Sequence, residues 1–403
     1  MALNLFGTGY DRNARLFLAV TFTAGFGGSA MSLAASVWVL SLTGSASLAA
    51  LCGLAVFVPA LFGPIIGAVV DRLPRKRLLV WTNIMLALTL LALLAVQSRA
   101  QLWLIFAVML GYGVGHVLVD AGESALMQTS VAGQSLGQLN SLRMSVQEGM
   151  KLVAPLAGAG LFAALGGGSV AVLAAMALLV AALLYTRIRD NGLAVARTRG
   201  LVGQTWEGLR FLTGDPHLRT VVAVAALAVA ASGLANAASY VVLTADLHKP
   251  AEFAGVLTAA QGAGSIVGGL FGGRMIERRG EQATAMWGAA LYAIGSMMSS
   301  TPSILTVACG RTLSGVGLPW TVVAAFTVVQ RHTPHELVGR VSAGASTFIF
   351  GSTALAIPLG AALIVVIDHR VVLVGSALMT LVLIGARWSQ SADASPEPKQ
   401  VSP

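Results

Sequence analysis

The sequence predicts an all-α integral membrane protein with twelve transmembrane helices arranged as two pseudo-symmetric six-helix bundles. Three observations carry this prediction. The composition is 56% apolar and only 10% charged, the basic residues gather on one side of a twelve-span arrangement, and the two halves of the chain repeat the same features. A membrane-spanning helix needs about 20 apolar residues, so twelve spans occupy roughly 240 positions. The short connections that remain leave no room for a separate soluble domain.

Apolar runs between charged or turn-rich breaks set the limits of the twelve spans. The first run is too long for the core of a signal peptide and lacks a cleavage site, so we expect a retained span. The predicted spans are 16–42, 46–70, 78–97, 102–122, 143–165, 169–187, 219–245, 252–274, 283–300, 303–329, 342–367 and 371–388.

The distribution of basic residues orients these spans. With the N-terminus in the cytoplasm, twenty of the 25 Lys and Arg lie in cytoplasmic segments, and only Arg99, Lys249 and Arg370 lie in outer loops. Cytoplasmic loops of membrane proteins carry such an excess. We therefore expect a multi-pass protein of the inner or plasma membrane with both termini cytoplasmic. The net charge of +9 belongs to this topology rather than to nucleic-acid binding.

A charged break after the sixth span divides the chain. We expect an N-terminal bundle at 1–187, a cytoplasmic linker at 188–218, a C-terminal bundle at 219–388 and a disordered tail at 389–403. Apolar residues near helical spacing within the linker suggest an amphipathic segment on the inner membrane surface, with a plain linker as the alternative. These residues are Val202, Trp206, Leu209, Phe211 and Leu212.

The two halves repeat the same features at an offset of about 200 residues, as expected for a chain built from internal repeats. The paired segments are GAVVDRLPRKR (67–77) with GRMIERRG (273–280), GVG (113–115) with GVG (315–317), and PLAG (155–158) with PLG (358–360). Two halves of like orientation are a known transporter architecture, with a substrate site between them near the bilayer midplane.

These residues resemble the major facilitator superfamily, and within it the branch of twelve-helix multidrug and siderophore efflux proteins. The loop at 67–77 is similar to the family signature, with Pro74 where the general pattern has Gly. Similar support comes from LTGSASLAALCGL (42–54), EGLRFLTGDPHLR (207–219) and PHELVGRVSAG (334–344). The resemblance covers nearly the whole chain.

The resemblance implies that the loop after the second span latches the N-terminal half to the eleventh helix in the outward-facing state. A carboxylate at such a helix end can accept hydrogen bonds from the start of a neighbouring helix. The alternative is that the basic residues of this loop only set the orientation of the helices in the membrane. The implied latch residues are Gly67, Asp71, Arg72, Arg75, Arg77 and, as a partner, Asp120.

Ionisable groups inside spans cost about 2.5–3.5 kcal/mol each and are candidates for function. Glu148 and Lys151 lie three residues apart, on one face of the fifth span, and can form an ion pair. Protonation of Glu148 would split the pair and couple it to transport, whereas a static pair would only hold helices together. Asp120 and Glu123 lie near the cytoplasmic end of the fourth span, where both can be interfacial.

Two further groups are candidates for proton coupling. His116 is one of them, because histidine is the side-chain type used most often for proton transfer near neutral pH; a hydrogen-bonded histidine without this role is the alternative. Arg311 precedes a Gly-x-Gly in the tenth span. In the family such an Arg belongs to the fourth helix and is tied to proton transfer, whereas this chain has Met109 at that place.

The fifth span is similar to the antiporter motif of the family, a Gly-Pro followed by small residues. Gly149, Pro155 and Gly158 form the motif here, with Ala154 in place of the Gly before the proline. Pro155 removes one backbone hydrogen bond and permits bending. The motif favours antiport, and ordinary small-residue packing is the alternative.

The resemblance implies a substrate cavity walled mainly by the first, fourth, seventh and tenth helices. A wall of aromatic and Met side chains with few fixed charges suits apolar or weakly cationic compounds. The candidate lining residues are Phe22, Phe26, Met31, Trp38, Phe57, Tyr112, Asn236, Tyr240, Gln261, Trp320 and Phe348.

The sequence thus favours a secondary transporter, not an enzyme, that exports a small amphipathic compound, drug-like or siderophore-like, in exchange for protons. We expect no metal and no cofactor, with the proton gradient as energy source, and a monomer whose partners are substrate, protons and membrane lipids. Cys52 and Cys309 lie in separate apolar runs and are expected to be inert core thiols. A nutrient facilitator or importer, and a lipid-handling or sensor protein on a transporter fold, remain alternatives.

Overall fold

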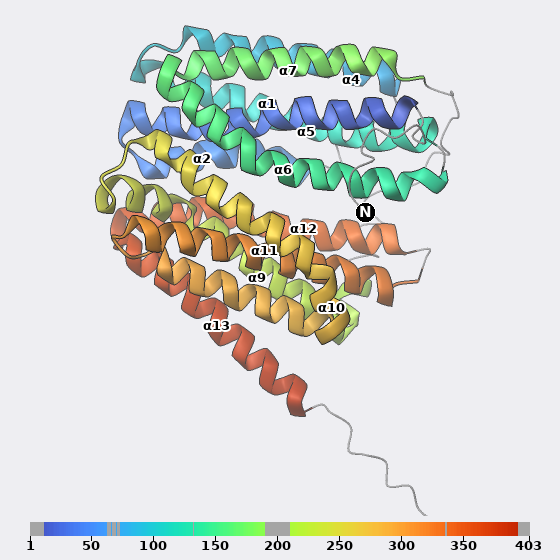
Figure 1. Ribbon diagram of the computed structural model, residues 1–403, viewed down its shortest axis with the longest axis vertical. Helices are drawn as coiled ribbons and strands as arrows, with labels where there is room; N and C mark the ends of the chain where they lie inside the picture. Colours follow the sequence, from blue (N-terminus) through green and yellow to red (C-terminus); the bar gives the residue numbers. More distant parts are fainter. Residues whose placement is uncertain are drawn as a thin grey trace, which may run out of the picture.

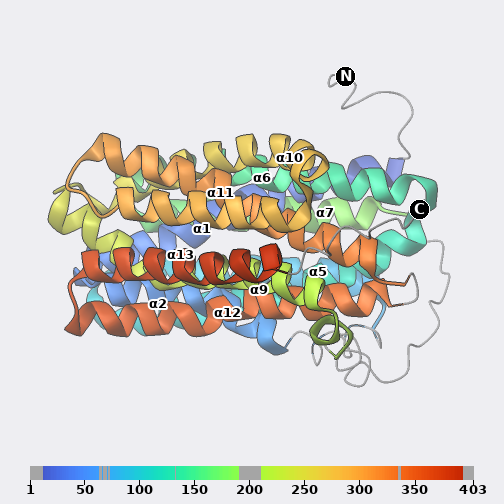
Figure 2. The ribbon, with the colours of Figure 1, turned by 90° about the horizontal axis from the view of Figure 1, so that it is seen from below.

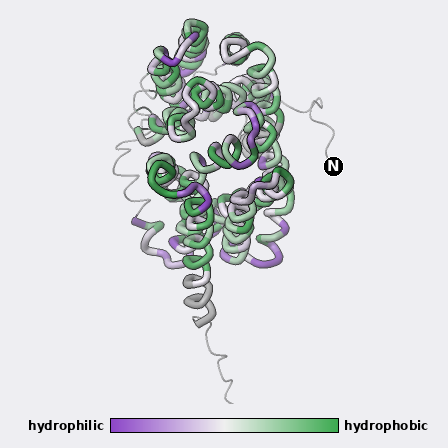
Figure 3. The backbone as a smooth tube through the Cα atoms, turned by 90° about the vertical axis from the view of Figure 1, so that its left-hand side faces the viewer, coloured by the Kyte–Doolittle hydropathy of each residue, from purple (hydrophilic) through white to green (hydrophobic). Residues whose placement is uncertain are grey.

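The computed structural model describes residues 12–62, 66, 70, 73–131, 133–189, 210–334 and 337–393. The described chain forms helices joined by short connections, without a strand. The helices lie in two groups, one above the other in Figure 1, and most of them run roughly parallel to one another (Figures 1 and 2). Coloured by hydropathy, they are mostly apolar, and hydrophilic residues are confined to short stretches (Figure 3).

Short connections join the helices of the first group, and a serine caps the start of its second helix. Ser45 accepts a hydrogen bond from the backbone N–H of Leu48 at the start of the second helix, which satisfies one free donor there. The elements of the first group are α1 (Arg12–Thr43), α2 (Ala46–Phe57), η1 (Val58–Phe62), α4 (Arg75–Leu91), η2 (Ala92–Ala95), η3 (Arg99–Gln101), α5 (Leu102–Ser130), α6 (Gly133–Leu165) and α7 (Gly167–Arg187).

The second group begins with a well-capped helix. The Asp215 carboxylate accepts hydrogen bonds from the backbone N–H groups of His217 and Leu218, and Pro216 occupies the first helical position. The elements are α9 (Pro216–Val241), η4 (Val242–Asp246), η5 (Ala251–Phe253), α10 (Ala254–Met298), α11 (Ile304–His332), α12 (Val338–Val366) and α13 (His369–Asp393).

The helices confirm the predicted fold class. Eight of the described helices are long and apolar enough to cross a membrane, and three shorter apolar helices, 46–60, 153–165 and 369–385, account for further spans. The helix α10 comprises two crossings, because Gly280 adopts φ 80° and ψ 168° and reverses the chain without a separate loop. The twelve predicted spans are therefore all represented.

Several helices extend beyond their predicted spans. The predicted fifth span begins at 143, but α6 begins at Gly133, and α5 continues to Ser130 rather than 122. Hydropathy marks where the apolar surface ends, whereas helical hydrogen bonding continues through polar residues beyond it. Leu212, predicted to lie on the membrane surface, is 2% exposed and packs in the core of the second group. Phe211 packs against the same core, and the other predicted residues of the amphipathic segment, Val202, Trp206 and Leu209, lie outside the described residues.

The two ends of the bundle differ. We call the end at Arg189 and Arg210 the linker end, and the opposite end, with the connections at Gly166 and Pro250, the loop end. At the loop end the groups touch: the Ser47 hydroxyl donates to the Ala361 carbonyl at 2.7 Å, and apolar residues of α2, α9 and α12 form one cluster. At the linker end each group has its own core cluster, and the groups diverge toward this end (Figure 1).

The internal repeat is visible in the helix contacts. A Cβ at Gly113 would collide with the Val56 carbonyl of α2, and a Cβ at Gly315, its counterpart, would collide with the Gln261 carbonyl of α10. Each glycine thus lets the fourth helix of its half approach the second helix closely. The same equivalence holds for Gly158 against α1 and for Gly360 against α9.

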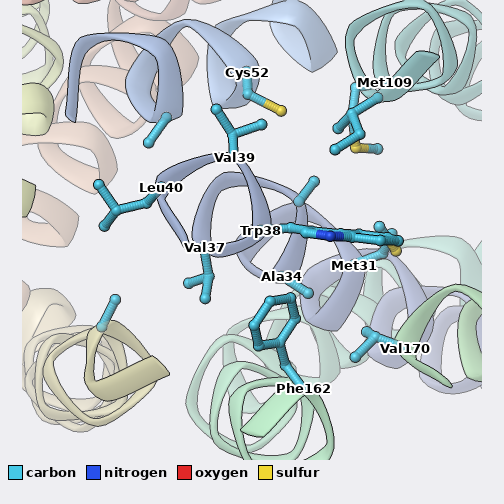
Figure 4. Packing of buried hydrophobic residues seen from close by; sticks show 14 of the residues in the cluster. Met31, Ala34, Val37, Trp38, Val39, Leu40, Cys52, Met109, Phe162 and Val170 are labelled. Carbon is cyan, nitrogen blue, oxygen red and sulfur yellow. The ribbon is translucent and has the colours of Figure 1, made fainter. Parts of the chain in front are cut away.

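The core of the first group, which continues into second-group residues such as Ala238 and Leu257, contains two residues that the sequence placed in the substrate cavity. Met31 and Trp38 are 0% and 8% exposed and pack among Val39, Met109 and Phe162 (Figure 4). The Trp38 and Phe162 rings meet edge to face, with centroids 6.3 Å apart. Both predicted cavity residues therefore belong to helix packing.

The two cysteines have different environments, contrary to the expectation that both are core thiols. Cys52 is buried in the core of the first group, whereas Cys309 is exposed on α11. In a membrane span an apolar position can face either the core or the lipid, and the sequence does not distinguish the two.

Candidate functional site

A cavity of about 660 Å³ lies between the two groups of helices. Its wall includes residues of α1, α2, α5 and α6 from the first group and of α9, α10 and α11 from the second. Sites for small organic ligands commonly measure about 300–1,000 Å³. The loop-end contacts close one end of this cavity, and it extends along the helices to residues near the linker end, such as Glu123 and Tyr185.

Toward the loop end, the cavity wall carries a guanidinium group. Nη1 of Arg311, on α11, donates to Oε1 of Gln261, on α10, at 3.1 Å. Nε of Arg311 is buried and has no hydrogen-bond partner within the described part of the chain. Tyr240 of α9 also lines the wall here. This part of the cavity is therefore rich in hydrogen-bond donors.

The small residues of α10 and α11 place Arg311 against Gln261. Gly315 lies one turn after Arg311, and Gly264 lies one turn after Gln261. A Cβ on either glycine would collide with a backbone carbonyl of the facing helix, that of Gln261 or of Thr312. Close approach of the two backbones brings the Gln261 amide within reach of the guanidinium.

Toward the linker end, the cavity wall carries a buried ion pair. Nη2 of Arg143 lies 3.1 Å from Oε2 of Glu123, and the two side chains are 11% and 7% exposed. Arg143 also donates through Nε to the Thr21 hydroxyl at 3.1 Å. The other Glu123 oxygen and the neighbouring Tyr185 hydroxyl are both buried. The pair joins α5 to α6 and, through Thr21, to α1.

One face of α5 presents a stripe of polar residues to the cavity. Tyr112, His116, Asp120 and Glu123 all line it, and their spacing of three or four residues places them on one helix face. His116 and Asp120 are exposed, whereas Glu123 is buried. The stripe extends from the middle of the cavity to its linker end.

The structure separates the predicted cavity residues into two sets. Tyr112, Asn236, Tyr240, Gln261 and Phe57 line the wall. The others do not belong to it: besides Met31 and Trp38, these are Phe22, Phe26, Trp320 and Phe348. Phe22 and Phe348 are largely exposed, Phe26 packs on the core, and the Trp320 indole N–H donates to the Gly268 carbonyl at 2.8 Å.

The predicted coupling pair and most of the predicted latch fall outside what the structure describes. Glu148 and Lys151 lie on α6, but their side chains are not among the described ones, although Gln147 and Met150 beside them line the cavity. Gly67, Asp71 and Arg72 lie outside the described residues. Of the rest, Arg75 is half-buried at the start of α4 and Arg77 is exposed.

The motif on α6 lies where the two groups meet. A Cβ on Gly255 of α10 would lie 2.9 Å from the Pro155 carbonyl, and a Cβ on Gly158 would lie 2.9 Å from the Ala30 carbonyl of α1. Gly149 has open space around it. Pro155 and Gly158 therefore fit α6 closely between α1 and α10 at the closed end of the cavity.

Sequence reasoning missed the Glu123–Arg143 pair. It placed Glu123 near the cytoplasmic end of the fourth span and Arg143 at the first residue of the fifth, because α6 was expected to begin only there, and it did not bring the two residues together. A usable signal was the spacing of His116, Asp120 and Glu123, which already placed three titratable groups on one face of α5.

Two helical bundles with a closed end, an open end and a solute-sized cavity between them define a membrane transporter. The sequence profile of the Major Facilitator Superfamily matches residues 16–243 and 221–402. The chain therefore belongs to the Major Facilitator Superfamily.

Among curated proteins, the chain is similar to drug efflux members of this family. It is 29% identical over 370 residues to the "Multidrug efflux pump Tap" of Mycolicibacterium fortuitum, covering 86% of each chain. It is 22% identical over 353 residues to "Macrolide efflux protein A" of Streptococcus pyogenes, covering 85% of each chain.

Solved structures share the fold at low sequence identity. A bacterial homologue of the iron transporter ferroportin in its inward-facing state superposes with a TM-score of 0.68 at 17% identity, covering 94% of this chain and 98% of that one. A nucleoside transporter gives 0.73 at 14% identity, covering 94% and 99%.

Proposed function

We propose that this protein exports a small amphipathic compound, of a drug-like or siderophore-like kind, by proton antiport through alternating access. The observation that carries the proposal is the cavity of about 660 Å³ between the two halves, closed at the loop end and bearing a buried carboxyl group toward the linker end. The similarity to a multidrug efflux pump and a macrolide efflux protein supports the direction and the class of cargo.

Glu123 is the proton acceptor that the described geometry favours. It is buried in the cavity wall, is paired with Arg143, and lies beside the Tyr185 hydroxyl. Protonation would remove the charge that holds Arg143 and would loosen the contact between α5 and α6. Asp120 and His116 lie on the same face of α5, on the loop-end side of Glu123, and extend the proton path from Glu123 toward the middle of the cavity.

Glu148 and Lys151 remain the second candidate for proton coupling. Both lie on α6, next to the cavity residues Gln147 and Met150. A transporter that exchanges more than one proton would use both carboxyl groups, and a comparison of the two glutamine variants assigns their roles separately.

In this mechanism the linker end faces the cytoplasm of a cell bounded by an inner or plasma membrane. The excess of basic residues in the segments at that end supports this orientation. The described state is then inward-facing, so the cavity receives substrate from the cytoplasm. Asp71, Arg75 and Asp120 would form the latch that closes the linker end in the opposite state.

Proton flux in everted membrane vesicles tests the proposal. Respiration acidifies the vesicle lumen, and addition of an exported compound is expected to release protons, read as recovery of a quenched acridine dye. The compounds are lipophilic cations, amphipathic acids, siderophore-like chelators and neutral macrolides. We expect the recovery to be abolished by Glu123→Gln and unchanged by Glu277→Gln, which alters an exposed carboxyl on α10 outside the cavity.

The variants also separate the alternatives. Loss of flux in Glu148→Gln but not in Glu123→Gln would move the proton site to α6. Substrate movement without proton release would indicate a facilitator, and a response to lipids alone would indicate a lipid-handling protein. Either of these last two results refutes antiport.

A further inference from the structure

The guanidinium of Arg311 carries a charge that no described residue neutralises. Its one hydrogen bond to a described residue, from Nη1 to Gln261 at 3.1 Å, goes to a neutral amide. Its Nε is buried without a partner, and none of the described ion pairs includes it. A guanidinium has five N–H donors, so the described residues use only a small part of its hydrogen-bonding capacity.

The position of Arg311 makes this charge unfavourable for the protein alone. It lies seven residues into α11, which corresponds to about 10 Å from the loop end of that helix. An unpaired charge at membrane depth is rarely retained without a functional reason. The Arg143 guanidinium in the same cavity, by contrast, has Glu123 as its counter-ion.

The other half of the protein shows that the fold does not need a charge at this place. The internal repeat pairs Arg311 with Met109, which is fully buried among apolar residues in the core of the first group (Figure 4). A methionine thus satisfies the packing requirement on α5. The arginine on α11 faces the cavity instead, so its role concerns what the cavity contains.

The surroundings of Arg311 define a polar headgroup site beside an apolar wall. Ser36 and Tyr240 line the cavity nearby, and Leu33, Met150 and Leu257 line it as well. We propose that Arg311 binds the anionic group of an amphipathic substrate, a carboxylate or an equally acidic oxygen group, while the apolar wall accommodates the rest of the molecule. A carboxylate accepts two parallel N–H bonds from one guanidinium.

This inference rests on the proposed transport function and reverses one expectation from the sequence, that weakly cationic compounds suit the cavity. A cation beside Arg311 would meet a like charge in a poorly solvated site. The acidic groups Asp120 and Glu123 do not offset this effect. With Met109 as the counterpart of Arg311, Glu123 lies 14 residues, or about 20 Å, further along the helix axis.

Equilibrium binding to the purified protein in dodecyl maltoside tests the inference. The probes share one apolar body and differ in charge: 2-naphthoate, 2-naphthamide and 2-naphthylmethylammonium. We expect calorimetry to show 2-naphthoate bound at least about tenfold more tightly than the other two, as a charge-assisted hydrogen bond implies. Arg311→Gln should remove this preference, and Arg311→Lys should retain part of it.

Gln261→Glu is a second variant that adds no volume. It places a carboxylate within reach of Arg311, which should occupy the guanidinium and remove the preference even if Arg311→Gln does not fold. Arg99→Gln, which removes an exposed cation at the loop end outside the cavity, should leave the preference intact.

Three results would overturn the inference. They are equal or weaker binding of 2-naphthoate than of the other two probes, no measurable 2-naphthoate binding, and a preference for 2-naphthoate that survives in both Arg311→Gln and Gln261→Glu. The measurement uses no proton gradient, so it is independent of antiport. Carboxylate-selective binding without proton-coupled flux would refute the proposed antiport alone. Proton-coupled export of cations without that selectivity would refute this inference alone.

Discussion

The buried ion pair between Glu123 and Arg143 yields the sharpest stability prediction. The two side chains are 7% and 11% exposed, so solvent screens their attraction only weakly. Removing one partner of such a pair costs about 3–5 kcal/mol, because the other charge is left buried and unpaired. Arg143→Gln also loses the bond to the Thr21 hydroxyl, which contributes about 1 kcal/mol. In this variant Glu123 can take up a proton, which removes its buried charge and so limits the total loss of stability.

We therefore expect Arg143→Gln to lower the free energy of unfolding by about 3 kcal/mol at neutral pH. Glu123→Gln combined with Arg143→Gln should lower it by only about 1 kcal/mol, since neutral groups need no counter-ion. If Glu123→Gln alone does not stabilise the protein, the coupling energy of the double-mutant cycle is then about 2 kcal/mol or more. Equilibrium unfolding in mixed detergent micelles, followed by tryptophan fluorescence, measures each variant.

A matched control exists in the same chain. Glu281 and Arg331 form an ion pair of 2.6 Å at the linker end of the second group, but the Arg331 side chain is 57% exposed. Solvent-screened pairs of this kind contribute about 0.2–1 kcal/mol, so its cycle should give a much smaller coupling energy. Equal coupling energies for the two pairs would refute the claim that burial makes the Glu123–Arg143 pair strong.

Three further predictions concern packing and access. Gly315→Ala should separate α11 from α10 and lower the free energy of unfolding by about 1–3 kcal/mol, measured as above; an unchanged value would contradict the close contact. Ser47→Cys with Ala361→Cys, in a chain lacking Cys52 and Cys309, should form a disulfide crosslink between the two groups at the loop end. If exported compounds leave the crosslinking yield unchanged, the result would argue against opening of the loop end during transport. A lipid-soluble maleimide should modify Cys309 and spare the buried Cys52; mass spectrometry showing equal labelling would contradict their different exposure.

The helices and their symmetry could be predicted because they depend on local chemistry. Long apolar runs with short breaks form membrane-spanning helices wherever they occur, and the repeated glycines mark equivalent contacts in both halves. Gly113 and Gly315 each lie against the second helix of their half, as their shared context implies. The resemblance of the loop at 67–77 to a family signature then led to the family that the comparison shows.

The cavity wall could not be predicted in the same way. In a membrane, residues facing lipid and residues facing the core are both apolar, so a span without polar residues carries no stripe that marks its orientation. Met31 and Trp38 were placed in the cavity with Tyr112 and Asn236, yet only the latter two line it. The rotation of each helix about its axis decides such cases, and packing against neighbours sets that rotation.

By itself, the sequence determined the number of spans, the two-fold repeat and the family, because hydrophobicity, small-residue spacing and signature loops are properties of contiguous residues. Only the tertiary structure decided which charges meet. Glu123 finds Arg143 on the next helix, whereas Arg311 finds a neutral amide, although both arginines lie on apolar helices. Charge pairing depends on distances of a few ångströms between separate helices, and those distances follow from how the whole bundle packs.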